Sequence, residues 1–272
     1  MEAKLITLIT DFGHKDPFVG IMKGVIFSIN PNANVIDLSH GIPPQDLTAG
    51  ALMLRYSAPF FPHGTIHVAV VDPGVGTTRR PVLIESEECF FIGPDNGIFS
   101  LALEGKKVSR IIHLANGTYH LKPTSATFHG RDIFAPVAAY LSLGVPPEDF
   151  GETVNDLIQF PWTAVTRTEG ALVGKVVYID GFGNLITNIH DRDLGLFQTE
   201  KLAISVAGVT TRGIAPHYSG GEEKSYAALI NSWGLLEISA FKGNAQLLCG
   251  AKIGDKVFIR EGQEVEGKPH ER

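Results

Sequence analysis

One aspartate at the end of an apolar run is the residue best placed for chemistry in this sequence. Residues 66–80 read IHVAVVDPGVGTTRR, so Asp72 follows β-branched and apolar residues and precedes a glycine-rich turn and two arginines. The run predicts a buried strand, and in an open α/β sheet ligands bind beyond the carboxyl ends of the strands. Asp72 is therefore placed either for chemistry or for capping a turn, which aspartate also favours.

A second aspartate has the same placement near the N-terminus. The run KLITLIT at 4–10 is followed directly by Asp11. Asp16 and Pro17 then predict the start of a helix, with Asp16 as its N-cap, because apolar residues recur at helical spacing over 18–29. The sequence thus predicts a carboxylate at the carboxyl end of each of two strands.

A histidine and an arginine precede a further predicted helix. His129 and Arg131 belong to the stretch FHGRDIFAP at 128–136, and the apolar helical pattern that follows ends at Gly144. The N-terminus of this helix would hold the two side chains near one place. A histidine before a helix is more often a solvated loop residue than a catalytic one, so this pair alone does not define a site.

The last hundred residues contain a loop suited to ligand binding. The stretch YIDGFGNLITN at 178–188 places Asp180, Phe182 and Asn184 around two glycines. A carboxylate, an aromatic ring and a side-chain amide suit a ligand with an ammonium group, a flat ring and hydrogen-bonding edges. Asx residues also favour turns for their own local hydrogen bonds, so the loop has a purely structural interpretation as well.

The order of the predicted elements divides the chain into two domains. Strands and helices alternate over residues 1–163, which predicts an α/β domain with a mostly parallel sheet covered on both faces. Helical periodicity ends in a polar stretch near 159–170, where we place the boundary. Residues 170–272 contain short apolar runs between glycine-rich turns, which predicts a small antiparallel barrel or sandwich.

The composition disfavours several classes of protein. A net charge of −6 gives no basic surface for a nucleic acid. The two cysteines, Cys89 and Cys249, have no CxxC spacing, which argues against a disulfide framework and a zinc site. No apolar run approaches the roughly 20 residues of a membrane span, and the N-terminus does not resemble a signal peptide. We therefore expect a cytoplasmic protein without a nucleic-acid or membrane partner.

Six motifs, taken in order, resemble the S-adenosylmethionine hydroxide adenosyltransferases, a family related to fluorinating and chlorinating enzymes. The motifs are TDFGHKDPFVG at 10–20, VVDPGVGTTRR at 70–80, GPDNG at 93–97, FHGRDIFAP at 128–136, IDGFGNLITN at 179–188 and NSWGLLEIS at 231–239. The resemblance implies an N-terminal α/β domain, a C-terminal antiparallel β-barrel, and a homotrimer that binds its ligand between domains of neighbouring subunits. It implies a reaction of water or hydroxide with S-adenosylmethionine that gives adenosine and L-methionine, with no metal and no cofactor.

The resemblance also implies roles for individual residues. The family's Asp-Arg-His triad matches Asp72, Arg79 and His129, although Arg80 adjoins Arg79 and motif spacing alone separates them. Asp11 matches the carboxylate that binds the ribose hydroxyls. The other substrate-binding positions are Asp16 and Asp180 near the methionine ammonium, Phe182, Asn184 and Ala245 around the adenine, Ser232 at the methionine carboxylate, and Trp233, where the halogenating relatives have arginine.

Two other functions remain open: a halide-dependent adenosyltransferase, and a protein that binds adenosine or S-adenosylmethionine without turnover. A cluster of Asp, Arg and His favours water over a halide, because only water needs a proton acceptor. We hypothesise that Arg79 lowers the pKa of the attacking water while Asp72 and His129 orient it and accept its proton. A Rossmann-type methyltransferase is disfavoured, because no GxGxxG motif follows the first strand.

Overall fold

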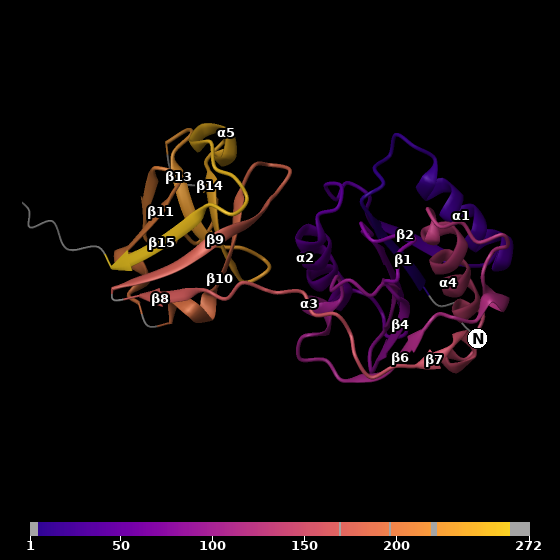
Figure 1. Cartoon of the computed structure of the whole chain (residues 1–272). Coiled ribbons are helices and arrows are strands. Elements are labelled where there is room, and N and C mark those ends of the chain that lie inside the picture. Colours follow the sequence, from indigo (N-terminus) through magenta and orange to yellow (C-terminus); the bar gives the residue numbers. More distant parts are fainter. Residues whose placement is uncertain (1–4, 169, 196, 219–221, 262–272) are drawn as a thin grey trace, which may run out of the picture. The chain divides into compact units, whose positions relative to one another are not determined.

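The chain divides into two compact units, Met1–Pro161 and Trp162–Arg272. Figure 1 shows the computed structural model, which describes residues 5–261 except 169, 196 and 219–221. Each unit has its own hydrophobic core and its own sheet, so each is described by itself.

The first unit is built on a seven-stranded sheet with the order β2-β1-β3-β5-β4-β6-β7. Its strands are β1 (Leu5–Thr10), β2 (Asn34–Ser39), β3 (Ile66–Val70), β4 (Pro81–Ser86), β5 (Phe90–Pro94), β6 (Val108–His113) and β7 (Glu152–Thr153). The first four strands of that order pair in parallel, whereas β4, β6 and β7 pair antiparallel. The α/β class is confirmed, but the sheet is mixed, because the short turn between β4 and β5 permits only a hairpin.

Helices cover both faces of this sheet, as predicted (Figure 1). On one face α1 (Phe18–Ile29) packs against α4 (Ala135–Ser142), and on the other α2 (Leu47–Ser57) packs against α3 (Ser100–Leu103). The predicted N-cap of α1 is wrong: Pro17 occupies that position, and no side chain caps the helix. At α2 an aspartate does cap the helix: the Asp46 carboxylate accepts a hydrogen bond of 2.9 Å from the Ala49 N–H.

The register of β1 against β3 sets the position of the two strand-end aspartates. All of β3 is buried, and Thr10 of β1 lies opposite Val70 of β3 in a parallel pair. Both strands therefore end at the same level. Asp11 and Asp72, which follow them by one and two residues, lie at the same edge of the sheet.

The second unit is an antiparallel sheet that nearly closes into a barrel. Its main order is β12-β11-β15-β9-β10-β14-β13, and β8 pairs with β9 outside this path. The edge strands β12 and β13 contact each other, which confirms the predicted β-barrel. The elements are β8 (Thr166–Thr168), β9 (Ala171–Ile179), β10 (Leu185–His190), β11 (Leu202–Val206), β12 (Val209–Arg212), β13 (Tyr226–Ile230), β14 (Leu235–Ala240), α5 (Ala245–Cys249) and β15 (Lys256–Glu261).

Candidate active site

Asp72, Arg79 and His129 form one hydrogen-bonded cluster. The Arg79 guanidinium donates from Nε to Asp72 Oδ1 at 2.9 Å and from Nη2 to Asp72 Oδ2. Nη2 also lies 2.8 Å from His129 Nδ1. The side chains of Arg79 and Asp72 are only 7% and 5% exposed, so the ion pair is largely withdrawn from solvent. Of the polar atoms in the described part of the chain, Arg79 Nη1 is one of the few that are buried without a hydrogen-bond partner.

The neighbouring arginine belongs to a different network. Arg80 donates to the buried Asp95 from Nε at 3.0 Å and from Nη2 at 2.6 Å, and its Nη1 lies 2.9 Å from Asp156. Asp95 in turn accepts a hydrogen bond from the Ile158 N–H at 2.8 Å. The structure thus separates two arginines that motif spacing left hard to tell apart: Arg79 pairs with Asp72 and His129, and Arg80 does not.

The turn after β3 has its shape because its glycines pack tightly. Gly76 has φ +77°, and a Cβ there would lie 2.3 Å from the Ala126 carbonyl oxygen, so only glycine fits against the 125–127 loop. That loop is held by buried Asp132, which accepts hydrogen bonds from the Ser125 N–H at 2.8 Å and from Arg131 Nη2 at 2.9 Å. Arg131 therefore supports the loop, and His129 lies at the N-terminus of the helical segment Gly130–Phe134, beside Arg79.

His129 is held as a neutral ring. Burial and the positive charge of Arg79 lower the pKa of His129, and the carboxylates of Asp72 and Asp132 oppose this shift without cancelling it. Because a guanidinium can only donate, His129 Nδ1 must accept the bond from Arg79, and the ring proton lies on Nε2. His129 is consequently a hydrogen-bond donor on its other side.

A cavity of about 670 Å³ opens onto this cluster and contains Asp11. Three of its lining rings, Phe12, Phe18 and Phe128, contact each other edge-to-face with centroids 5.3–5.8 Å apart. Asp11 Oδ2 accepts a hydrogen bond of 2.8 Å from the backbone N–H of Gln45, which also lines the cavity. Gln45 has φ +65°, a conformation uncommon outside glycine, and nothing in the sequence signals it.

A second cavity, of about 580 Å³, lies in the C-terminal unit and contains Asp180, Phe182 and Asn184. Asp180 Oδ1 accepts hydrogen bonds from the N–H groups of Phe182 and Asn184 at 2.9 Å, and Oδ2 accepts one from Asn184 Nδ2 at 2.9 Å. The carboxylate thus orders its own loop, as the structural interpretation predicts. Phe182, by contrast, is 81% exposed, which leaves its ring free to contact a ligand.

Four of the predicted substrate-binding residues do not line either of these cavities. Asp16 is exposed before α1. Ser232 is exposed in the β13–β14 turn, where the Trp233 ring lies 6.1 Å from that of Tyr178. Ala245 is buried at the start of α5, and the next residue donates a backbone hydrogen bond of 3.0 Å to the Gly183 carbonyl, which ties α5 to the Asp180 loop.

A buried carboxyl group that the sequence pattern did not predict lies beside the second cavity. Glu237 of β14 is 2% exposed and accepts hydrogen bonds from Tyr218 Oη at 2.9 Å and from Asn231 Nδ2 at 3.1 Å. Burial raises the pKa of Glu237, and burial together with Glu237 raises the pKa of Tyr218 to about 12. A glutamate inside the apolar run LLEIS was the signal that could have identified it.

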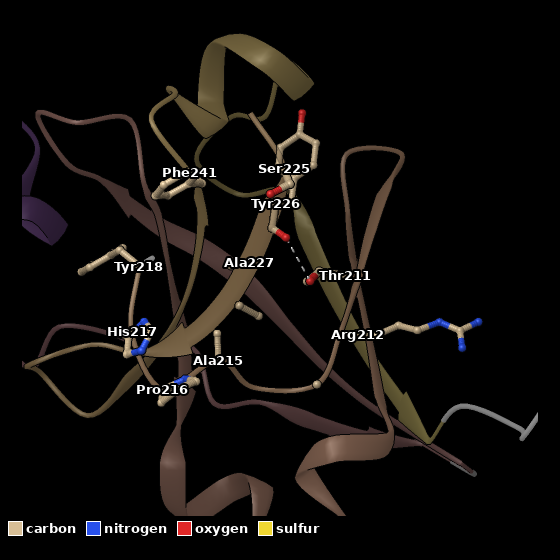
Figure 2. Close-up of a pocket in the computed structure, with 12 residues that line it drawn as sticks. Thr211, Arg212, Ala215, Pro216, His217, Tyr218, Ser225, Tyr226, Ala227 and Phe241 are labelled. Carbon is tan, nitrogen blue, oxygen red and sulfur yellow. Dashed lines mark hydrogen bonds between the residues drawn. The ribbon is translucent and has the colours of Figure 1, made fainter. Parts of the chain in front are cut away.

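Figure 2 shows the residues that line a third cavity, of about 310 Å³, which shares Tyr218 with the second cavity. It is walled by residues 215–218 and by β13, where Thr211 Oγ1 donates a bond of 3.4 Å to the Tyr226 carbonyl. The Arg212 side chain points away from it. This cavity contains none of the predicted site residues.

The buried Asp72–Arg79–His129 cluster, at the carboxyl edge of parallel strands and open to a large cavity, is typical of an α/β enzyme that acts on a small molecule. In the described part of the chain, no three or more His, Cys, Asp or Glu side chains are grouped so that they could hold a metal ion. Nor does that part contain a helix long and apolar enough to cross a bilayer.

Comparison with known proteins identifies the family. Residues 6–151 match the SAM hydroxide adenosyltransferase N-terminal domain, and residues 174–258 match the corresponding C-terminal domain. The chain belongs to the SAM hydroxide adenosyltransferase family.

Several relatives are similar over almost their whole length. The chain is 38% identical to an (R)-S-adenosyl-L-methionine hydrolase of Thermus thermophilus, over 93% of this chain and 98% of that protein. It is 34% identical to a protein of the same name from Methanocaldococcus jannaschii, over 94% and 95% of the two chains. A fluorinase of an Actinoplanes species is more distant, at 26% identity over 86% and 90%. A crystal structure of a conserved Thermotoga maritima protein superposes with a TM-score of 0.88 at 32% identity, covering 94% of this chain and 100% of that one.

The His129 environment makes a prediction for NMR titration. Replacing Arg79 with methionine removes the nearby positive charge and leaves the Asp72 carboxylate, so the pKa of His129 is expected to rise relative to the wild type. The control is Arg80→Met, which removes an adjacent arginine that faces Asp95 and should leave the His129 titration unchanged. An unchanged His129 pKa in Arg79→Met would show that the described contact does not govern the ring.

Proposed function

We propose that this protein hydrolyses (R)-S-adenosyl-L-methionine to adenosine and L-methionine, with water or hydroxide attacking C5′ of the ribose. The observation that carries the proposal is the buried Asp72–Arg79–His129 cluster, which matches the triad expected in the family to which the chain belongs. The hydrolases among the relatives are also more similar to this chain than the fluorinases are.

In the proposed step the oxygen nucleophile forms a bond to C5′ as the C5′–S bond breaks. The electron pair of that bond passes to the sulfonium, which leaves as the neutral thioether of methionine. An anionic nucleophile and a cationic centre cancel their charges in the transition state, so a site of low dielectric favours the reaction. The 5% and 7% exposure of Asp72 and Arg79 supports such an environment.

We propose a different task for each of the three members of the cluster. Arg79 stabilises a hydroxide by its positive charge, because its guanidinium lies directly behind Asp72 and His129, which line the cavity. His129 presents its Nε2 proton and orients the oxygen, because its Nδ1 is already bonded to Arg79. The proton of the water therefore passes to Asp72. His129, which we hypothesised from the sequence as a second proton acceptor, has no such role in this proposal.

The same cluster favours water over a halide. A fluoride or chloride ion needs donors but no proton acceptor, and the Asp72 carboxylate would repel it. Because the sulfonium is already a strong leaving group, we propose that the reaction needs neither a metal nor a cofactor. We assign Asp11 to the ribose hydroxyls, since it lines the same cavity as Asp72 and His129.

The second cavity supports a role in binding the two ends of the substrate. Its exposed Phe182 ring and buried Asn184 amide suit an adenine base. The other proposed contacts, which rest on the family resemblance, are Ala245 at the adenine, Asp16 and Asp180 at the methionine ammonium, and Ser232 and Trp233 near the methionine carboxylate.

We propose that the protein works as a homotrimer with its active sites at subunit interfaces. The support is the family resemblance, together with the presence of candidate binding residues in a cavity of each unit. A cytoplasmic location is also proposed, since neither Cys89 nor Cys249 forms a disulfide in the described part of the chain, as is usual in a reducing compartment.

Product analysis tests the reaction. The wild-type protein incubated with S-adenosylmethionine should release adenosine and L-methionine in equal amounts, measured by liquid chromatography and mass spectrometry. Adding sodium chloride or sodium fluoride should yield no 5′-halogenated nucleoside. A halide-dependent product would instead indicate a halogenating enzyme, and tight binding without any product would indicate a binding protein.

A matched pair of substitutions tests the triad. Arg79→Lys keeps the charge but loses the two-point contact with Asp72 and the bond to His129, so kcat should fall by about 10²- to 10³-fold. The control is Arg80→Lys, which weakens the contact with Asp95 and should lower the melting temperature while kcat stays within about threefold. Equal losses of kcat in the two variants would contradict the assignment of Arg79.

A further inference from the structure

A series of contacts between polar side chains lies next to Asp11. The proposed mechanism gives these side chains no role. Thr10 Oγ1 lies 2.8 Å from Nδ1 of His40, and His40 Nε2 lies 2.9 Å from Asp37 Oδ1. Asp37 in turn pairs with Lys23 at 2.5 Å. Thr10 is fully buried and His40 is 1% exposed, so neither side chain can reach a ligand itself.

Asp37 anchors these contacts as an anion. Burial alone would raise the pKa of Asp37, but its contacts with Lys23 and His40 lower it, so Asp37 is an anion near neutral pH. His40 Nε2 lies within ion-pair distance of this carboxylate without being aligned for a hydrogen bond, and the other ring nitrogen, Nδ1, is hydrogen-bonded to the Thr10 hydroxyl. The Thr10 oxygen remains free to accept, and it does so from the Phe12 N–H at 3.2 Å.

These contacts fix the backbone on both sides of Asp11. Thr10 precedes Asp11, and its hydroxyl holds the N–H of Phe12, which follows. One residue further on, the Gly13 N–H donates to the His40 carbonyl at 2.8 Å. The Asp11 carboxylate is itself held on one side by Gln45. His40 thus contacts the Asp11 loop twice, once through its ring and once through its backbone.

We propose that Thr10 and His40, anchored by Asp37, are positioning residues that set Asp11 for recognition of the ribose hydroxyls. The inference rests on the proposed function, in which Asp11 binds those hydroxyls. A hydrogen bond to a hydroxyl depends steeply on distance and angle, so a displaced carboxylate loses selectivity for the hydroxyl before it loses general affinity for the nucleoside.

The same strand supplies a matched control. Thr7 of β1 is also fully buried, and its Oγ1 lies 2.7 Å from Nδ1 of His67, which is fully buried in β3. The two threonines therefore have the same burial and the same kind of partner. They differ in place, since Thr7 lies within strand β1 and Thr10 ends it, directly before Asp11.

The test compares Thr10→Val with Thr7→Val by isothermal titration calorimetry, using adenosine and 2′-deoxyadenosine as probes. Each substitution keeps the shape of the side chain and removes one buried hydroxyl. In Thr10→Val the preference for adenosine over 2′-deoxyadenosine should fall at least about tenfold, whereas Thr7→Val should keep the wild-type preference. Thr10→Ser, which retains the hydroxyl, should restore most of it.

A second variant removes the contact between Thr10 and His40 from the histidine side. In His40→Gln the amide reaches Asp37 but not Thr10, so the preference of this variant for adenosine should fall as in Thr10→Val. The two variants test the contact independently, so one of them is sufficient if the other folds poorly. Equal preferences in Thr10→Val and Thr7→Val, or equal losses of affinity for both nucleosides, would overturn the proposal. Because binding is measured without turnover, these outcomes are independent of whether the wild-type protein hydrolyses S-adenosylmethionine, which the product analysis decides.

Discussion

The buried ion pair between Asp72 and Arg79 is the constraint on which the candidate site depends. A guanidinium that is 7% exposed is tolerated only when a carboxylate meets it at hydrogen-bonding distance, and Asp72 does so with both oxygens. The pair requires β3 to end where it does and the following turn to fold back on glycines such as Gly76. Burial and the positive charge of Arg79 lower the pKa of the neighbouring His129, which keeps this ring neutral.

The two carboxylates at this edge of the sheet have different hydrogen-bond partners. Asp72 is paired with a buried cation, whereas Asp11 is held by the Gln45 backbone N–H at the wall of an open cavity. The parallel register of β1 and β3 brings them together, and their separate partners distinguish them. We connect the first environment with the attack of water and the second with recognition of a neutral hydroxylated sugar.

Local sequence pattern was enough to predict the strands that end at Asp11 and Asp72, because continuous apolar runs that stop at a charged residue have few alternatives. It could not distinguish Arg79 from Arg80 physically, since the direction of each side chain is set by partners distant in sequence, such as Asp95. The left-handed conformation of Gln45 likewise depends on tertiary packing. The order of the strands in the sheet was only partly predictable, because the positions of short strands in the sequence do not determine which of them pair as hairpins.

Incorporation of solvent oxygen into adenosine shows directly whether water attacks C5′. The protein is incubated with S-adenosylmethionine in water enriched in oxygen-18, and the adenosine and methionine are analysed by mass spectrometry. A cluster that directs water to C5′ predicts one heavy oxygen at the 5′ position of adenosine and none in methionine. Adenosine with an unlabelled 5′ oxygen, or no adenosine above the uncatalysed background, would contradict the account.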